Sequence, residues 1–390
     1  MIVYLDNSAT TRAYDKVALD MSEMLTTTYG NPSALHPMGI SAEKRVRDAR
    51  KQVAKMMSAN EKEIIFTSCG TESDNMAIMG VANSRKHQGN KIITTKVEHP
   101  AVLEVCKSLQ NQGFEVAYLD VDRKCNIDLE QLKSEINEKT TLISIMTVNN
   151  ETGTIMPIKE VAELAQNQAK SMGREWGKDL ILHTDAVQAL GKIPLTNLGA
   201  HMISLSAHKI HGPKGVGALY LKDGVKLPPL ILGGGQEKGM RSGTENAPGI
   251  VGFGTACSLA EDNFERRVTS MTKVRSYLLE GIKENIKDIV VNSPEDGCPS
   301  VLNVSFLGTR GEVLLHTLEQ DGIMVSTGSA CSSGKKGFSH VLTSMGLSPK
   351  EIEGAIRFSF SEFNTIEEMD YVLDKLQVAV TRFRRLGSFR

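Results

Sequence analysis

The sequence predicts an α/β protein with a large domain of seven mainly parallel strands and a smaller α+β domain, and three observations support this. Seven short apolar runs rich in β-branched residues lie in the first two-thirds of the chain. Several are separated by segments of helix length, as in doubly wound folds. After about Cys257 the pattern changes to a long charged helix, followed from about Pro299 by a mixed stretch. The seven predicted strands are residues 63–67, 91–95, 115–121, 141–148, 180–184, 201–205 and 216–221.

Among the connecting segments, residues 41–57 give the clearest helical pattern. The apolar positions Ala42, Val46, Ala49, Val53 and Met56 follow helical spacing and should lie on a core. A chain of 390 residues is too long for one ordinary domain. We expect residues 15–256 to form the large domain, and residues 1–14 and 257–390 to form the small one.

The composition is typical of a soluble globular protein, with 40% hydrophobic residues, 23% charged residues and a net charge of −1. This balance favours neither nucleic acid nor a membrane surface as the main partner. The amino terminus lacks secretory-signal features and no apolar run has membrane-spanning length, so we expect a cytoplasmic protein. The six cysteines contain no C-x-x-C pair and are interpreted as reduced thiols.

Polar residues follow most of the predicted strands directly. In an open α/β sheet, ligands bind beyond the carboxyl ends of the strands, so these residues should converge on one crevice. The crevice is predicted to contain Thr71, His99, Asn150, Asp185, Gln188, Ser206, His208 and Lys209.

The first of these segments, "SCGTESDN", follows a strand and opens a helix. Its backbone N–H groups and the Thr71 hydroxyl suit a phosphate at the positive helix end, although an ordinary helix N-cap would read the same way. It matches neither a P-loop nor a dinucleotide fingerprint. Asp185 and Gln188 can face one edge of a ligand, and a carboxylate against a ring nitrogen is what pyridoxal phosphate requires. An N-cap is the alternative for Asp185.

Two lysines compete for the role of a Schiff-base lysine. Lys209, partly shielded from water in "SAHKIHGPKG", could lose its proton and bind a carbonyl, whereas a surface charge is the alternative, and Lys214 is the competitor. His99 could stack on a planar cofactor or move protons, or be structural. His183, His208 and His211 match no metal motif, so we expect no metal site formed by the protein alone.

A single cysteine, Cys331, stands in the small and flexible stretch "STGSACSSGKKG". It has no partner at disulfide or metal-motif spacing. It is either an incidental thiol in a loose loop or a nucleophile that needs a mobile arm.

Ten motifs together identify a family. They resemble, in family order, the pyridoxal-phosphate-dependent cysteine desulfurases of the NifS/IscS-like kind within the class V aminotransferase group, and they cover nearly the whole chain. The motifs are "YLDNSATT" (4–11), "YGNPSALH" (29–36), "FTSCGTESDN" (66–75), "EHPAV" (98–102), "VNNETG" (148–153), "HTDAVQALGK" (183–192), "SAHKIHGPKG" (206–215), "GMRSGTEN" (239–246), "STGSACSSG" (326–334) and "IRFSF" (356–360).

The resemblance implies the fold-type I architecture of pyridoxal-phosphate-dependent transferases and a homodimer with its active sites at the subunit interface. It implies that Lys209, not Lys214, forms the Schiff base, that Asp185 pairs with the pyridine nitrogen, and that His99 stacks on the ring. The remaining implied sites are the ring hydroxyl (Gln188, Asn150), the phosphate (Gly70, Thr71, Ser206, His208, and Thr244 from the other subunit) and the substrate carboxylate (Asn31, Arg357).

The implied reaction converts L-cysteine to L-alanine and an enzyme persulfide. Lys209 acts as the base at Cα, and the Cys331 thiolate attacks the substrate sulfur, with His99, Lys335 or Lys336 helping to deprotonate the thiol. Sulfur then passes to an acceptor protein, such as an iron–sulfur scaffold or a tRNA-thiolating enzyme. With such a partner, Cys331 could also ligate an iron–sulfur cluster transiently. The short tether predicts that the Cys331 loop moves.

One residue departs from the family pattern, and the resemblance leaves rivals open. Cys69 stands where many relatives carry glycine, as a small filler or a second reactive thiol. A selenocysteine lyase or a small-amino-acid aminotransferase would share Lys209 and Asp185 without the same need for Cys331. A non-catalytic scaffold would need none of these residues.

Overall fold

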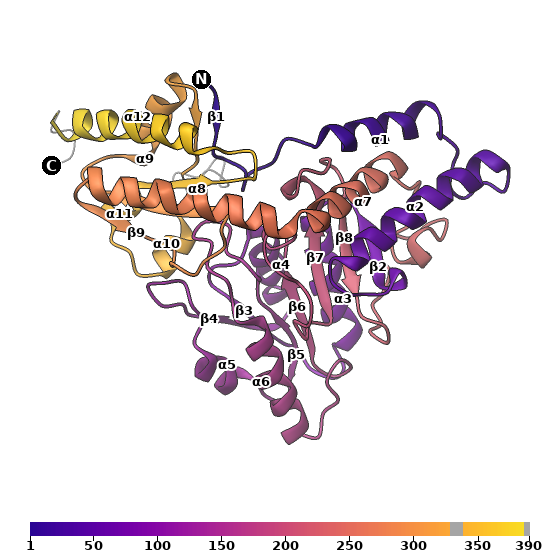
Figure 1. The fold of residues 1–390 in the computed structure, drawn as a ribbon. Coiled ribbons are helices and arrows are strands. Elements are labelled where there is room, and N and C mark those ends of the chain that lie inside the picture. Colours follow the sequence, from indigo (N-terminus) through magenta and orange to yellow (C-terminus); the bar gives the residue numbers. More distant parts are fainter. Residues whose placement is uncertain (328–337, 386–390) are drawn as a thin grey trace.

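The computed structural model describes residues 1–327 and 338–385, and its larger part is built on a seven-stranded sheet (Figure 1). The strand order is β2-β8-β7-β6-β5-β3-β4, and β8 is antiparallel to both of its neighbours while the other pairs are parallel. Each predicted strand overlaps one strand of this sheet, so the predicted fold class is confirmed. The strands are β2 (Ile64–Thr67), β3 (Lys91–Thr95), β4 (Glu115–Leu119), β5 (Thr140–Ser144), β6 (Ile181–Asp185), β7 (Met202–Ser206) and β8 (Gly217–Leu221).

Helices cover both faces of this sheet, and the strands alternate accordingly. Ile64 and Phe66 pack into one core with α2, α6 and α7, whereas Ile65 packs into the other core with α3 and α4. Successive strand residues point to opposite faces, so two cores need apolar residues at nearly every strand position. The helices of this part are α1 (Asp15–Thr26), α2 (Pro37–Lys55), α3 (Gly70–Arg85), α4 (Pro100–Gln110), α5 (Leu129–Glu135), α6 (Ile158–Ser171) and α7 (Ala247–Asp262).

A second part has its own core around an antiparallel sheet in the order β12-β10-β9. The predicted charged helix after Cys257 is α8, and β1, near the amino terminus, belongs to the same part of the molecule as α12 (Figure 1). The predicted limit between residues 256 and 257 falls inside α7, which runs from Ala247 to Asp262. The predicted domain limits stay a prediction. The elements are β1 (Val3–Tyr4), α8 (Phe264–Asn285), β9 (Ile289–Val291), β10 (Val301–Phe306), α9 (Gly311–Gln320), β11 (Ile323–Met324), β12 (Ala355–Ser359) and α12 (Ile366–Arg385). The short helices α10 (His340–Ser344) and α11 (Pro349–Glu353) instead pack Val341, Leu342 and Ile352 into a core of the larger part.

Residues 5–14 cross from the second part to the first. After β1, which pairs with β11, Ser8 N donates to Ser359 Oγ at 2.8 Å, and Thr11 N donates to the carbonyl of His208 at 3.0 Å. This segment therefore bonds both to β12 of the smaller sheet and to the turn that follows β7 of the larger one. Of the helices described, none is both long and apolar enough to cross a membrane.

Candidate active site

A cavity of about 230 Å³ opens at the carboxyl ends of the parallel strands. All eight residues that the strand-end argument placed in one crevice line it, together with Gly70 and Arg357. The predicted site residues that it brings together are Gly70, Thr71, His99, Asn150, Asp185, Gln188, Ser206, His208, Lys209 and Arg357. Their roles stay predictions at this point.

The turn from β2 into α3 forms one end of the cavity. Cys69 is the N-cap residue of α3 and makes no side-chain cap, so an ordinary side-chain N-cap does not explain this motif. Gly70 lies so close to the neighbouring loop that a Cβ there would approach Val187 Cγ2 to 2.7 Å. Ser206, at the end of β7, is buried, and its Oγ has no hydrogen-bond partner among the described residues. These groups suit an anion that accepts from N–H and O–H donors at a helix N-terminus.

Asp185 is the last residue of β6 and faces the cavity floor. Its Oδ1 accepts from Val187 N at 2.9 Å, which closes a turn instead of capping a helix. Burial raises the pKa of Asp185, while His99, the Val187 N–H and Lys209 oppose the increase. A protonated ring nitrogen placed against this carboxylate would stabilise its charged form.

A second buried carboxyl, Asp74 on α3, also lines the cavity. It is 1% exposed, its Oδ1 has no hydrogen-bond partner among the described residues, and it lies 3.6 Å from His183 Nε2. Burial and the nearby Asp185 raise the pKa of Asp74 well above its usual range, and burial lowers the pKa of His183 to about 3. The environment that raises the pKa of Asp74 therefore favours its protonated form beside a neutral imidazole.

Lys209 ends the short helix η2 (Ala207–Lys209), directly after β7. Its Nζ donates to the carbonyl of Ser8 and, at 2.8 Å, to the carbonyl of Ala9, so the amino-terminal segment holds the amine. Lys209 is half-buried and lines the cavity, whereas Lys214 is exposed and lies outside it. The geometry favours Lys209 for bond formation inside the cavity.

His99 forms a side wall and also caps α4. Its Nδ1 accepts from Ala101 N at 3.1 Å, so in the neutral ring the proton lies on Nε2. Burial lowers the pKa of His99, with Asp185 opposing and Lys209 and His340 adding to the decrease. The ring is therefore neutral near pH 7 and suited to stack on a planar ligand.

Gln188 takes its orientation from a residue that the strand-end argument missed. Lys192 Nζ donates to Gln188 Oε1 at 2.9 Å, and Gln188 Nε2 donates to the carbonyl of Ser8 at 3.0 Å. An ammonium can only donate, so it fixes which end of the amide faces it. The spacing of four residues between Gln188 and Lys192 was the sequence signal for this contact. It was missed because lysines are rarely buried.

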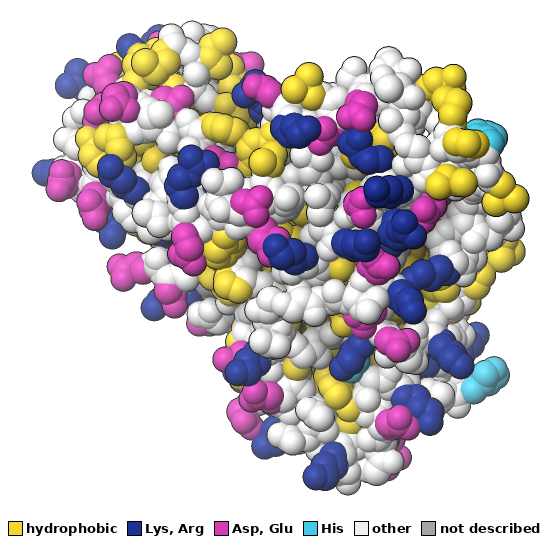
Figure 2. Space-filling view, turned by 45° about the vertical axis from the view of Figure 1, so that its right-hand side comes forward, with side chains coloured by type: hydrophobic (Ala, Val, Ile, Leu, Met, Phe, Trp, Pro, Cys, Tyr) yellow, Lys and Arg dark blue, Asp and Glu magenta, His cyan; other side chains and the backbone are white. Residues whose placement is uncertain are grey.

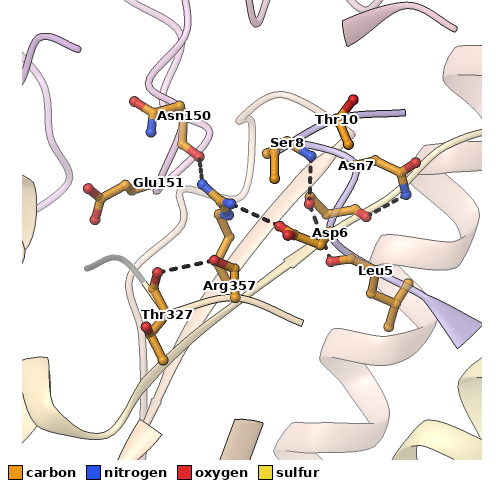
Figure 3. Close-up of polar contacts among 12 residues, drawn as sticks. Leu5, Asp6, Asn7, Ser8, Thr10, Asn150, Glu151, Thr327 and Arg357 are labelled. Atoms are coloured by element: carbon orange, nitrogen blue, oxygen red, sulfur yellow. Dashed lines mark hydrogen bonds and ion pairs between the residues drawn. The ribbon is translucent and has the colours of Figure 1, made fainter. Parts of the chain in front are cut away.

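Arg357 reaches the cavity from β12 in the second part. Its Nη1 donates to the carbonyl of Asn150 and its Nη2 pairs with Asp6 Oδ1, both at 3.0 Å (Figure 3). The side chain is 3% exposed. A guanidinium held from two sides in this way can present its remaining donors to a carboxylate in a fixed direction.

Two of the predicted residues that the structure describes do not line this cavity. Asn31, in the loop between α1 and α2, and Thr244 are both exposed and do not line it. The predicted carboxylate pair of Asn31 and Arg357 is therefore separated within one chain. Cys331, with Lys335, Lys336 and the predicted loop motion, lies outside the described residues.

Ser8, Cys69 and Asp74 line the cavity although the sequence argument did not include them in the crevice. Ser8 comes from the amino-terminal segment, which no strand-end rule covers. The five described cysteines are free thiols, and the described part of the chain contains no group of three or more His, Cys, Asp or Glu side chains placed to hold a metal ion.

Comparison with known proteins places this site in a family. The class-V aminotransferase family model matches residues 3–372. The chain is 43% identical to the cysteine desulfurase IscS of Clostridium botulinum (strain Hall), over 99% of this chain and 96% of the relative. The chain belongs to the NifS/IscS-like cysteine desulfurases of this family.

Solved structures of this group agree in fold. A structure described as a NifS-like protein is 41% identical, covers 98% of this chain and all of its own, and superposes with a TM-score of 0.91. A structure described as SspA in complex with cysteine is 33% identical, covers 93% of this chain and all of its own, and gives a TM-score of 0.79.

Like its family, this cysteine desulfurase depends on pyridoxal phosphate, which a lysine binds as a Schiff base. The cavity fits this group: the buried Ser206 Oγ without a partner and the close backbone at Gly70 suit the phosphate, and Asp185 suits the pyridine nitrogen. Its substrate is L-cysteine, and its product sulfur passes to an acceptor protein.

Proposed function

We propose that this cysteine desulfurase works through Lys209 as the Schiff-base lysine and Cys331 as the sulfur-accepting nucleophile. The observation that carries the proposal is the convergence of Lys209, Asp185, His99 and Arg357 on one cavity, from two parts of the chain with separate cores. The cysteine named in the SspA structure supports an amino acid of this size as the ligand of such a site.

The residues around the cavity divide the binding of the cofactor among them. Thr71, Ser206 and the N–H groups at the start of α3 would hold the phosphate, with His208 beside them. Asp185 would hold the pyridine N–H, His99 would stack on the ring, and Gln188 and Asn150 would lie at the ring hydroxyl. When bound, pyridoxal phosphate supplies an electron sink that acidifies the Cα proton of the amino acid.

The chain's own groups then move the protons and the sulfur. Arg357 orients the L-cysteine carboxylate, and the Lys209 amine takes the proton from Cα. The Cys331 thiolate attacks the substrate sulfur: an S–S bond forms, the C–S bond breaks, and its electron pair stays with carbon. That carbon takes up a proton, the Lys209 ammonium returns its proton to Cα, and the product leaves as L-alanine, while the enzyme keeps the persulfide.

Described residues before and after residues 328–337 support the proposed role of Cys331. Ser326 exchanges two backbone hydrogen bonds with Arg357, at 3.1 Å and 2.7 Å. On the other side, Ser339 Oγ donates to the buried carboxylate of Glu151 at 2.5 Å, next to Asn150. Both flanks therefore start from residues at the mouth of the carboxylate site.

Persulfide formation with L-cysteine tests these roles. We expect Cys331→Ala to bind pyridoxal phosphate normally but to form no persulfide, and Lys209→Ala to lose the Schiff-base absorbance. Cys69→Ser is the matched control, because Cys69 lines the cavity without a proposed role. Persulfide formation by Cys331→Ala, or its loss in Cys69→Ser, would contradict the assignment.

We also propose a homodimer in which Asn31 and Thr244 enter the partner's cavity. Their chain neighbours Pro32 and Glu245 line the same surface groove, separate from the cavity. Exposed apolar side chains lie along the edge formed by α1 and α2 (Figure 2). They are Leu19, Leu25, Tyr29, Leu35, Met38 and Ile40, and Leu230, Ile231 and Leu232 in the segment after β8 are exposed as well. Such a patch is typical of a subunit interface.

Mixed dimers test this arrangement. A Lys209→Ala chain combined with a Thr244→Ala chain would regain one intact site per dimer if Thr244 acts in the partner's cavity. Activity restored to about half of the wild-type value is expected. No restoration above the Thr244→Ala level would mean that Thr244 acts within its own chain.

The sulfur acceptor stays open among an iron–sulfur scaffold, a tRNA-thiolating enzyme and a thiamine-pathway carrier, and the cytoplasmic location stays a prediction. Mixing the persulfidated enzyme with purified candidates and measuring which cysteine gains sulfur would identify the acceptor.

A further inference from the structure

We propose that Asp6 is a positioning residue that fixes the Arg357 guanidinium for the carboxylate of the substrate. The proposal rests on the function proposed above, in which Arg357 binds that carboxylate. Asp6 belongs to the "YLDNSATT" segment, which the proposed reaction does not otherwise use.

The guanidinium is fixed from two directions (Figure 3). Asp6 Oδ1 holds Nη2 at 3.0 Å, and the Asn150 carbonyl holds Nη1 at 3.0 Å. With both terminal nitrogens held, the planar group has little freedom to rotate about its long side chain. Its direction is set before any ligand binds, which reduces the entropy lost on binding.

One nitrogen of this guanidinium makes no hydrogen bond to the described residues. Arg357 Nε is buried and has no hydrogen-bond partner among the described residues, while the side chain lines the cavity. A buried donor without an acceptor costs free energy, so an incoming oxygen is favoured there. Together with the second N–H of a terminal nitrogen, Nε forms the kind of edge that binds a carboxylate through both oxygens.

Asp6 has a fixed position because its backbone and that of its neighbours are bonded to β12. Asp6 forms a β-bridge with Ser359, two residues after Arg357 on the same strand. The Asn7 side chain donates to the Ser359 carbonyl at 2.9 Å, and Ser8 N donates to Ser359 Oγ at 2.8 Å. The carboxylate and the guanidinium are therefore anchored to one strand.

A purely electrostatic role for Asp6 predicts different behaviour. Asp6 is 23% exposed and Arg357 3% exposed, so the pair also neutralises a buried charge. Asn at this position would keep an oxygen acceptor for Nη2 but lose the charge. Positioning is therefore retained in Asp6→Asn and lost in Asp6→Ala, whereas neutralisation is lost in both.

The experiment compares ligands with and without a carboxylate on the holoenzyme. Binding of L-alanine, and of cysteamine, which has the amine and thiol of cysteine but no carboxylate, is measured from the cofactor absorbance, and KM and kcat are measured for L-cysteine. We expect Asp6→Ala to weaken L-alanine binding and to raise KM by about tenfold with kcat within about twofold, while cysteamine binding is unchanged. Asp6→Asn should stay within about threefold of wild type.

Two control variants distinguish a failure of the Asp6 proposal from a failure of the proposed role of Arg357. Asp15→Asn removes the same charge from an exposed ion pair with Arg12 and should change nothing. Arg357→Ala should weaken L-alanine far more than cysteamine, and if it does not, the proposed role of Arg357 fails. If Arg357→Ala discriminates but Asp6→Ala does not, or if Asp6→Asn behaves like Asp6→Ala, the positioning role of Asp6 is wrong.

Discussion

Lys192 carries a buried positive charge that the fold should be more stable without. Its side chain is 4% exposed and its Nζ donates to Gln188 Oε1, and within residues 1–327 and 338–385 no ion pair involves it. Burial lowers the pKa of Lys192 to about 8, with Cys298 opposing and Arg267 and Arg357 adding to the decrease. We therefore predict that Lys192→Met is more stable than wild type but less active.

The size of the effect follows from that pKa. One pKa unit corresponds to about 1.4 kcal/mol, so a pKa lowered from 10.5 to about 8 makes the charged ammonium cost about 3 kcal/mol of unfolding free energy at pH 7. Loss of the Gln188 hydrogen bond offsets about 1 kcal/mol of this. The cost is fully present below the folded pKa and falls as the pH rises toward 10.5. Lys192→Met should thus gain about 2 kcal/mol at pH 7 and under about 1 kcal/mol at pH 9.5.

Denaturant unfolding of both holoenzymes at pH 7 and pH 9.5 measures this difference. Lys159→Met, at an exposed lysine, is the matched control and should show no such pH dependence. Because Lys192 also orients the Gln188 amide, we expect kcat/KM to fall by about tenfold in Lys192→Met. A stability gap that is equal at both pH values, or a less stable Lys192→Met at pH 7, would refute the reasoning.

Two further substitutions probe the cofactor loop and the junction between the two parts. Gly70→Ala places a Cβ 2.7 Å from Val187 Cγ2, so pyridoxal phosphate affinity should fall by about tenfold in an absorbance titration, and adding Val187→Ala should restore it. Burial would raise the pKa of Glu362, but Arg267, Tyr14 and His211 outweigh it and lower the pKa. Glu362→Gln leaves the Arg267 charge, 2% exposed, without its carboxylate, and should cost about 3 kcal/mol above pH 5. In pH-dependent unfolding, this gap should begin to narrow as the pH falls below the ordinary pKa of a glutamate, 4.5, and close as it passes the lowered pKa of folded Glu362.

Most of the sheet could be predicted because its strands are buried on both faces. Residues 91–95 coincide with β3, where every position is buried, so a continuous β-branched run marks the whole strand. The predicted start of a helix was less accurate, because capping residues outside the apolar pattern determine where a helix begins. The predicted helix at 41–57 begins earlier in α2, because His36 caps it and Pro37 occupies its first position.

The cavity could be predicted only as far as the strand-end rule reaches. That rule finds Asp185 and Ser206, which are the last residues of β6 and β7. It cannot find Asp6 and Ser8, because they lie in the amino-terminal segment and not at the carboxyl end of a strand of the large sheet. Hydrogen bonds to β12 position that segment. Lys192 was missed for a different reason, since composition places lysine at the surface.

The segment from Asp6 to Ala9 explains how two separately folded parts can serve one small substrate. Lys209 comes from the large sheet and Arg357 from the smaller one, and the two sheets have different cores. The proposed reaction needs the amine at Cα and the guanidinium at the carboxylate, which are groups one bond apart in an amino acid. The carbonyls of Ser8 and Ala9 hold Lys209, and the Asp6 carboxylate holds Arg357. Neighbouring residues of one extended segment make both contacts. If the two parts shift relative to each other, the positions of the Lys209 amine and the Arg357 guanidinium are therefore both set relative to this one segment.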